Sequence, residues 1–426
     1  MDKLRIVGGA PLRGTIAVGG AKNAALPLMT AALLTDETLT LANMPDVADI
    51  TAMAGLLHLL GVHLNLQGDA GANDDTHVVD FTAKNIASTT APYDLVRKMR
   101  ASILVLGPLL ARAGEARVSL PGGCAIGTRP VDLHLEALKK LGAEIDIESG
   151  YVLARAPKGL VGGDIVFPVV TVTGTENALM AACLAKGRTT IANAAREPEV
   201  TDLAQCLVKM GADIQGIGTD KLLIQGKPRL HGAKHSIVPD RIQAGTYLMA
   251  VGMAGGSIEV KGAKPPHLQA ALDVLQACGM QFEPTIEGLR ATCTGRLKAA
   301  DVDTAPFPLF PTDLQAQFMA LMTLADGTSH IAENIFENRF MHVQELIRLG
   351  ADIAVKGHTA RVCGVPKLTG APVMATDLRA SVSLVMAGLA AQGETTVSRI
   401  YHLDRGYERL EEKLARCGAH IERVRG

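Results

Sequence analysis

The order of apolar and polar positions repeats six times along the 426-residue chain. In each copy, a helix that is apolar nearly all round is followed by a glycine, a strand rich in threonine, valine and isoleucine, and an amphipathic helix. The second helix closes with a glycine at Gly61, Gly142, Gly211, Gly279, Gly350 and Gly418, at intervals of 81, 69, 68, 71 and 68 residues. Such spacing is typical of supersecondary units that bury their apolar faces against neighbouring copies. The pattern therefore predicts six similar α/β units.

The helices that open the copies are expected to be buried, because residues 178–185, 314–325 and 380–391 are apolar on nearly every face. The expected strands are residues 189–192, 257–260, 328–332 and 395–397. Polar pairs precede the helices, namely Lys22-Asn23, Tyr93-Asp94, Glu176-Asn177, Asp240-Arg241, Thr312-Asp313 and Thr376-Asp377. At each pair, helix capping and a functional role are both open. If the opening helices are packed in parallel, their N-termini would favour phosphate and carboxylate.

Chain length and charge narrow the fold class and the ligands. A chain of this length exceeds one ordinary hydrophobic core, so the six units divide into two domains of three. Lys plus Arg number 42 and Asp plus Glu number 43, so no overall field favours nucleic acid or an anionic membrane. With no Trp, five Tyr and eight Phe, base-stacking surfaces are not expected either. Anionic ligands must therefore be met by locally placed arginines and lysines.

Cysteine usage and the N-terminal sequence indicate a cytoplasmic protein. The seven cysteines are odd in number and show no CxxC spacing, which argues against a disulfide framework or a zinc site. The N-terminus enters a strand pattern without the apolar stretch of a signal peptide. The longest uncharged stretch, residues 242–258, is interrupted by Gln243, Thr246 and four glycines, so no membrane span is expected.

The longest repeat interval contains a loop whose residues suggest chemistry. Residues 121–130 read PGGCAIGTRP, so Cys124 follows two glycines and precedes Arg129. Cationic surroundings favour the reactive thiolate, whereas the other six cysteines lie in apolar patterns typical of core positions. A cysteine hydrolase would also need a histidine; His134 lies ten residues further on but fits helix packing equally well. An inert Cys124 remains the alternative.

Lys22 begins an apolar helix after Gly19 and Gly20, which would let the backbone approach a ligand. A lone lysine with no evident partner suggests anion binding, and a solvated lysine at a domain edge is the alternative. The GxxxxGK[ST] spacing of a P-loop is absent.

Five arginines stand in otherwise uncharged or unusual contexts: Arg100, Arg129, Arg339, Arg379 and Arg405. Arg379 opens an apolar helix, where an unpaired guanidinium would be costly. Arg405 could simply pair with Asp404, and any one of the five could be a solvated surface residue. Together they suggest convergence on a polyanion. Asp313 and Asp377 are possible general bases, or helix caps with a structural role.

Several motifs together closely resemble the enolpyruvyl transferases, and among them those that act on UDP-N-acetylglucosamine. The matching segments are Ala21-Lys22-Asn23-Ala24, Met99-Arg100-Ala101-Ser102, Leu120-Pro121-Gly122-Gly123-Cys124, Gly127-Thr128-Arg129-Pro130-Val131-Asp132-Leu133-His134, Phe336-Glu337-Asn338-Arg339-Phe340, Thr376-Asp377-Leu378-Arg379 and Asp404-Arg405-Gly406-Tyr407-Glu408. The resemblance runs from Lys3 to the C-terminus. The relative that uses shikimate 3-phosphate has a Gly-Ser-Lys-Ser type start and lacks the cysteine loop.

The resemblance implies two inside-out α/β barrel domains, each built from three βαβαββ repeats, with the active site in the interdomain cleft. It places the catalytic-loop domain at residues 22–237. The second domain is discontinuous and takes residues 1–21 and 238–426.

The same resemblance assigns the site residues. The catalytic set is Cys124, Asp313, Lys22 and Arg405. Phosphoenolpyruvate would be held by Lys22, Asn23, Arg129, Arg379 and Arg405. UDP-N-acetylglucosamine would be met by Arg100, Arg129, Pro130, Val131, Asp132, Leu133, Val169, Val170, Thr171, Val172, Asp313 and Ile335. Arg339 and Asp377 would support the site.

Three positions depart from the family pattern. Val169 stands where some members have a lysine, and residues 171–177 vary a more usual Ser-Val-Gly-Ala-Thr. These two changes make nucleotide contacts through the backbone of residues 169–173 the expectation. Gln243 replaces a glutamate, and its role is left open.

The implied reaction moves the enolpyruvyl group of phosphoenolpyruvate to the sugar 3′-hydroxyl by addition and elimination, the committed step of bacterial peptidoglycan synthesis. It implies the acid role for Cys124, which would also carry a pyruvate adduct and be alkylated by fosfomycin, and the base role for Asp313. No metal, cofactor or obligatory protein partner is expected; the partners are the two small-molecule substrates. The alternatives are an enolpyruvyl transferase with another acceptor and an inactive repeat protein that senses a nucleotide sugar.

Overall fold

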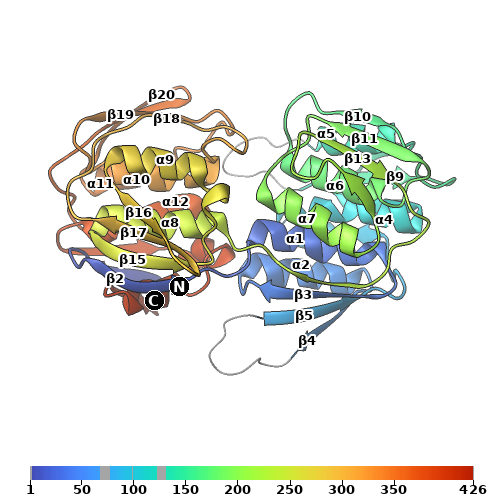
Figure 1. Ribbon diagram of the computed structural model, residues 1–426, viewed down its shortest axis with the longest axis horizontal. Helices are drawn as coiled ribbons and strands as arrows, with labels where there is room; N and C mark the ends of the chain where they lie inside the picture. Colours follow the sequence, from blue (N-terminus) through green and yellow to red (C-terminus); the bar gives the residue numbers. More distant parts are fainter. Residues whose placement is uncertain (1, 68–76, 98, 122–130, 426) are drawn as a thin grey trace. The chain divides into compact units, whose positions relative to one another are not determined.

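A computed structural model of the chain describes residues 2–67, 77–97, 99–121 and 131–425. These residues separate into two compact units (Figure 1). The central unit comprises the described residues from Gly19 to Val238. The terminal unit comprises those before Gly19 and after Val238, so it contains both ends of the described chain.

Each unit contains three four-stranded sheets among its described residues. In the central unit the strand orders are β14 (Ala233–Ser236), β3 (Thr38–Met44), β5 (His77–Thr82), β4 (His63–Gln67); β6 (Thr90–Ala91), β7 (Glu115–Ser119), β9 (Tyr151–Arg155), β8 (Glu144–Glu148); and β10 (Asp164–Val166), β11 (Arg188–Ala192), β13 (Lys221–Gln225), β12 (Asp213–Gln215). Strand β14 comes from the end of the unit but pairs with β3 near its start, with Ala233 opposite Leu39. This pairing closes the unit on itself.

The terminal unit repeats the same arrangement. Its strand orders are β16 (Gln281–Pro284), β17 (Gly288–Cys293), β15 (Gly256–Lys261), β2 (Leu12–Ala17); β18 (Val302–Asp303), β19 (Thr328–Ala332), β21 (Thr359–Cys363), β20 (Asp352–Lys356); and β22 (Pro372–Met374), β23 (Glu394–Ser398), β1 (Lys3–Val7), β24 (His420–Val424). Every one of these six sheets has one parallel pair and two antiparallel pairs. Six sheets with one pairing pattern confirm the predicted sixfold repeat.

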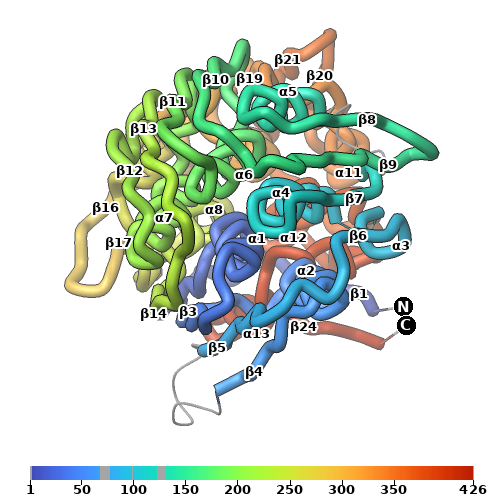
Figure 2. The backbone as a smooth tube through the Cα atoms, turned by 90° about the vertical axis from the view of Figure 1, so that its right-hand side faces the viewer, coloured from blue at the N-terminus to red at the C-terminus, as the bar shows by residue number. Residues whose placement is uncertain are grey.

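The helices α1, α6, α8, α10 and α12, whose residues are nearly all buried, lie inside the sheets of their unit (Figures 1 and 2). The central unit has α1 (Lys22–Ala31), α2 (Ala48–Leu59), α3 (Tyr93–Val96), α4 (Leu106–Ala113), α5 (Asp132–Lys140), α6 (Val172–Ala182) and α7 (Pro198–Lys209), with 3-10 turns η1 (Ala32–Leu34) and η2 (Arg100–Val105). The terminal unit has α8 (Arg241–Ala254), α9 (Gln269–Cys278), α10 (Gln315–Met322), α11 (Val343–Arg348), α12 (Leu378–Ala390) and α13 (Leu410–Arg416), with 3-10 turns η3 (Pro265–His267), η4 (Thr312–Leu314) and η5 (Ile400–Arg405). Each unit has its own core of buried apolar side chains, and α8, α10 and α12 pack against one another. The predicted α/β fold with helices inside is confirmed.

The six closing glycines share one backbone conformation. Gly61, Gly142, Gly211, Gly279, Gly350 and Gly418 have φ between +86° and +110°. L-residues with a Cβ rarely adopt this left-handed region, so each glycine ends its helix and turns the chain into the next strand. The repeat signal in the sequence therefore marks a backbone requirement.

Helix capping is confirmed at two of the six polar pairs. Asp240 accepts hydrogen bonds from the backbone N–H groups of Ile242 and Gln243, and Asp377 accepts them from Arg379 and Ala380. At the other four pairs the side chains form no cap of the helix that follows. Glu176 and Asn177 lie inside α6, because Thr171 begins that helix earlier and accepts from the N–H of Gly174. These four pairs therefore do not act as helix caps.

Burial explains the other cysteines. Cys183, Cys206, Cys278, Cys293 and Cys417 are buried, and Cys363 is partly exposed; all six are free thiols. Burial raises the pKa of Cys183 and of Cys206 to about 12, and that of Cys278 to about 11. Buried thiols are inert, so the predicted core role is confirmed for five of the six cysteines, and Cys363 departs from it because its side chain is partly exposed. Among the described residues, no helix is both long enough and apolar enough to span a membrane.

Candidate active site

The predicted site residues fall into three groups. Cys124, Arg129 and Pro130 lie outside the described residues. Lys22, Asn23, Arg100, Val131, Asp132, Leu133, Val169, Val170, Thr171 and Val172 belong to the central unit. Asp313, Ile335, Arg339, Asp377, Arg379 and Arg405 belong to the terminal unit. The terminal-unit group contains a compact charged cluster, which we describe first.

Asp313 is held by two arginines from separate elements. It lies in η4, where its Oδ1 accepts a hydrogen bond from Arg339 Nη2 at 2.6 Å and its Oδ2 accepts one from Arg379 Nη2 at 2.9 Å. The side chains of Arg339 and Arg379 are 6% and 5% exposed, whereas that of Asp313 is 24% exposed. We call Asp313, Arg339 and Arg379 the Asp313 cluster. Its carboxylate is fixed by buried cations and remains the accessible member.

The charges in this cluster set the protonation state of Asp313. Burial alone would raise the pKa of the carboxyl, but the guanidinium of Arg379, and then that of Arg339, lower the pKa well below its usual range. Burial disfavours the charge of Arg379, yet Asp313 and neighbouring acidic groups raise its pKa above the ordinary value. Asp313 and Arg379 are therefore both ionised at neutral pH.

Two further contacts hold Arg379 in place, one at its backbone and one at its side chain. Asp377 caps α12 by accepting from the Arg379 backbone N–H at 2.8 Å, which makes the predicted supporting role a helix cap. Arg379 Nη1 donates to the Tyr407 hydroxyl at 3.5 Å, and that hydroxyl lies 2.8 Å from Thr246 Oγ1. Tyr407 was not predicted as a site residue; its signal was its place in the Asp-Arg-Gly-Tyr-Glu motif.

Arg405 ends η5, one residue before a glycine that is anchored to α8. Gln243 Nε2 donates to the Gly406 carbonyl oxygen at 3.1 Å. The amide of Gln243 can make this bond, whereas an ionised glutamate has no proton to donate. Gln243, whose role the sequence left open, therefore has a structural role. Asp404, the suggested partner of Arg405, accepts two hydrogen bonds from Arg423 instead.

Lys22 has a carboxylate partner that the sequence analysis missed. It is the first residue of α1, is buried, and its Nζ lies 3.0 Å from Asp49 Oδ2 in α2. The alternative of a solvated lysine is therefore wrong, while Asn23 beside it is exposed. A Cβ at Gly20 would lie 2.0 Å from the Asn43 carbonyl oxygen, so close packing accounts for this glycine without a ligand.

Segments predicted to meet the nucleotide sugar surround His134. Val131 precedes α5, Arg100 begins η2, and Thr171 caps α6. Val169 is 61% exposed, and its segment leads into Thr171. His134 in α5 is buried, with its Nε2 3.1 Å from Thr173 Oγ1.

Asn177 fixes the tautomer of His134. The Asn177 Oδ1 accepts from the Gly107 N–H at 2.6 Å, so its amide nitrogen faces both the Ile103 carbonyl oxygen and His134 Nδ1, each at 3.1 Å. His134 Nδ1 must therefore accept, and the ring is neutral with its proton on Nε2. Burial, and then the charge of Arg100, lower the pKa of His134 to about 3. Its packing role is the alternative that the structure supports.

The depressed pKa of His134 predicts a loss of stability in acid. The unfolded chain takes up this proton near the ordinary imidazole pKa of 6.5, and the folded chain only near a pKa of about 3. The contribution is therefore complete above about pH 6.5 and is lost as the pH falls toward 3, by up to about 1.4 kcal/mol per pH unit. We expect the stability advantage of wild type over His134→Gln, measured by urea unfolding, to narrow between pH 7 and pH 4. A difference that stays constant over this range would contradict the neutral buried ring.

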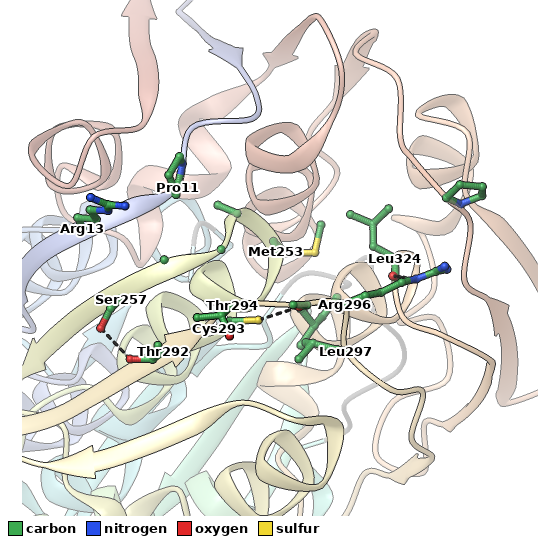
Figure 3. A pocket seen from close by; sticks show the side chains of 17 residues that line it. Pro11, Arg13, Met253, Ser257, Thr292, Cys293, Thr294, Arg296, Leu297 and Leu324 are labelled. Atoms are coloured by element: carbon green, nitrogen blue, oxygen red, sulfur yellow. Dashed lines mark hydrogen bonds between the residues drawn. The ribbon is translucent and has the colours of Figure 1, made fainter.

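A cavity of about 930 Å³ in the terminal unit lies apart from these residues (Figure 3). It is lined by residues of β2, the C-terminal end of α8, β15 and β17, including Arg13, Met253, Cys293 and Arg296. None of its lining residues is a predicted site residue. The Asp240 cap at the other end of α8 is about 18 Å away along the helix axis. Arg296 is engaged by the carbonyl oxygens of Leu324 and Ala325. The cavity is therefore not the predicted substrate site.

Comparisons with known proteins agree with this arrangement. Residues 6–414 match the family profile of EPSP synthase (3-phosphoshikimate 1-carboxyvinyltransferase). The solved enolpyruvyl transferase NikO from Streptomyces tendae is 26% identical, with a TM-score of 0.87 and 99% of each chain covered. EPSP synthase from Acinetobacter baumannii, at 18% identity and a TM-score of 0.75, shares the fold. By the matched profile, the chain belongs to the enolpyruvyl transferase family.

Within this family, the sequence groups with one particular enzyme. The UDP-N-acetylglucosamine 1-carboxyvinyltransferases of Rhodospirillum centenum and Paramagnetospirillum magneticum are 63% and 62% identical to the chain, over its whole length and 99% of theirs. The chain is thus a member of the UDP-N-acetylglucosamine 1-carboxyvinyltransferases, as the sequence motifs predict.

Proposed function

We propose that this enzyme transfers the enolpyruvyl group of phosphoenolpyruvate to the 3′-hydroxyl of UDP-N-acetylglucosamine and releases phosphate. The observation that carries this function is the identity of 60–63% over the full chain to enzymes of that name. The reaction is the first committed step of peptidoglycan synthesis. Its small-molecule partners are these two substrates.

The reaction is an addition followed by an elimination. A proton added to C3 of phosphoenolpyruvate gives C2 cationic character, and the sugar hydroxyl forms the new O–C2 bond while losing its proton. Removal of a proton from C3 and cleavage of the C2–O bond to phosphate then restore the alkene. The enzyme must supply an acid, a base and cations that hold the phosphate and carboxylate.

The Asp313 cluster fits the base and orienting role in this scheme. A carboxylate held ionised by two guanidiniums can accept a hydrogen bond from the sugar hydroxyl, and its accessible surface leaves room for that contact. Its lowered pKa makes it a weak base at rest. It therefore takes the proton only as the hydroxyl attacks, when the acidity of that proton rises sharply.

The remaining roles follow the motif assignments. Cys124 would protonate C3, and Lys22, Asn23, Arg129, Arg379 and Arg405 would hold phosphoenolpyruvate. The nucleotide sugar would lie against Arg100, residues 130–133, residues 169–172 and Ile335. The exposure of Val169 suits contacts that do not need a lysine side chain. The Lys22–Asp49 pair holds the ammonium group at the start of α1, ready for an anion.

A phosphate-release assay tests the function directly. We expect phosphate from phosphoenolpyruvate with UDP-N-acetylglucosamine, and a product whose mass equals the nucleotide sugar plus the enolpyruvyl group. Shikimate 3-phosphate in place of the nucleotide sugar serves as the control for another acceptor. Phosphate release only with shikimate 3-phosphate would show that the enzyme uses a different acceptor. Nucleotide-sugar binding without release under either condition would support the inactive sensor.

A further inference from the structure

Glu333 is a buried carboxylate outside every role assigned so far. It follows β19 directly and is 2% exposed. Its carboxylate accepts hydrogen bonds from Thr304 Oγ1 at 3.1 Å and from the backbone N–H groups of Ile335 and Phe336 at 3.0 and 3.1 Å. It also accepts from the Thr312 hydroxyl, at 2.9 Å to Oε1 and 2.8 Å to Oε2. One buried charge thus organises three separate segments.

One of these segments, the turn at Ile335 and Phe336, carries a predicted nucleotide contact. Two successive backbone N–H groups bound to one carboxylate oxygen fix the turn that follows β19. Ile335, at this turn, is 37% exposed and is expected to meet the nucleotide sugar. Phe336 is placed by the same turn, and its ring lies 5.0 Å from the Arg339 guanidinium carbon. The turn is therefore tied to Arg339 as well as to Glu333.

Thr312 links Glu333 to the Asp313 cluster by a hydrogen bond of fixed direction. Arg339 Nη1 donates to Thr312 Oγ1 at 2.7 Å, so the single hydroxyl proton of Thr312 is donated to Glu333. Arg339 uses its other terminal nitrogen for Asp313. The chain Asp313–Arg339–Thr312–Glu333 thus connects two carboxylates through one guanidinium and one hydroxyl.

We propose that Glu333 is a positioning residue that aligns Asp313 with the nucleotide-contacting turn at Ile335. This inference rests on the proposed function. Glu333 orients the Thr312 hydroxyl, this hydroxyl orients the Arg339 guanidinium, and the guanidinium holds the Asp313 carboxylate. Because the same carboxylate fixes the Ile335 turn, a nucleotide sugar seated on that turn meets Asp313 at a set distance. Buried hydrogen-bond networks hold their groups in one arrangement.

Removing the Thr312 hydroxyl breaks the link while changing little else. Thr312→Val keeps the shape of the side chain but can neither accept from Arg339 nor donate to Glu333. We expect kcat to fall about 10- to 100-fold, the scale for misplacing a reacting group. Thr312→Ser keeps the hydroxyl and is expected to retain kcat within about threefold of wild type. Thr323→Val is the matched control, because within the described part of the chain the buried Thr323 hydroxyl bonds only to the Ala320 carbonyl oxygen at the end of its own helix.

Glu333→Gln tests the other end of the chain. Its amide keeps one acceptor oxygen but places an NH₂ group against the hydroxyl and N–H donors, so both the turn and Thr312 lose alignment. We expect the Kd for UDP-N-acetylglucosamine, from calorimetry, to rise about tenfold and kcat to fall, with effects less than additive with Thr312→Val. Thermal unfolding of every variant shows whether it is folded.

The results separate the two proposals. Wild-type turnover with UDP-N-acetylglucosamine is measured first, and its absence would overturn the proposed function and this inference with it. With wild type active, a folded Thr312→Val that keeps its kcat would overturn the inference alone. So would a Thr312→Ser that fails to restore turnover, or a Thr323→Val that loses as much as Thr312→Val.

Discussion

Replacing Asp313 by asparagine is expected to lower kcat by about 10²- to 10⁴-fold, the usual range for a lost general base. The amide has no charge to balance Arg339 and Arg379, and its NH₂ group faces one of their N–H donors. The two buried guanidiniums would therefore be left poorly compensated. Removing one partner of a buried ion pair costs about 3–5 kcal/mol, and the 24% exposure of Asp313 places the expected loss of unfolding free energy at or below the low end. Steady-state kinetics and urea unfolding measure the two effects.

Asp313→Glu is the control that separates catalysis from stability. Glutamate keeps the charge for both arginines, so most of the unfolding free energy is expected to remain. Its extra methylene moves the carboxylate from the position set by η4, and turnover is expected to stay low. A folded Asp313→Asn variant with near-wild-type kcat would remove the carboxylate from the mechanism.

Cys124→Ala is expected to lose most steady-state activity, whereas Cys124→Asp is expected to keep turning over. If the essential role is proton donation to C3, an aspartic acid can hold and release a proton and an alanine cannot. The pH optimum of Cys124→Asp is expected to shift, because the reference pKa is about 3.9 for aspartate and about 8.5 for cysteine. The measurement is phosphate release across pH for both variants.

Fosfomycin gives the same position a second readout. This epoxide is expected to inactivate wild type, faster with the nucleotide sugar bound, and to leave Cys124→Asp unaffected because a carboxylate lacks the nucleophilic sulfur. Cys363→Ser is the matched control, since Cys363 is partly exposed and its loss is expected to leave inactivation unchanged. An inactive Cys124→Asp that still folds and binds the nucleotide sugar would mean that the thiol acts as a nucleophile.

The repeated pattern in the sequence was sufficient to predict the architecture. Closing glycines such as Gly279 are needed where the backbone is left-handed, and apolar residues are needed where a helix is buried. Both features depend on local residue type and can therefore be recognised from the sequence alone. Element ends were less certain. The helix expected at residues 178–185 begins at Val172, because a threonine cap several residues upstream competes with the polar pair inside it.

The candidate site was likewise predicted only in part from the sequence. The sequence by itself determined the fold class, the inert cysteines and the family motifs that contain Asp313, Arg379 and Arg405, since these depend on residue type and spacing. Only the tertiary structure decided the partners. Asp49 lies 27 residues from Lys22, and Arg379 lies 66 residues from Asp313. Buried charges are stable only when an opposite charge reaches them, and which charge does so depends on packing between helices that spacing along the chain does not specify.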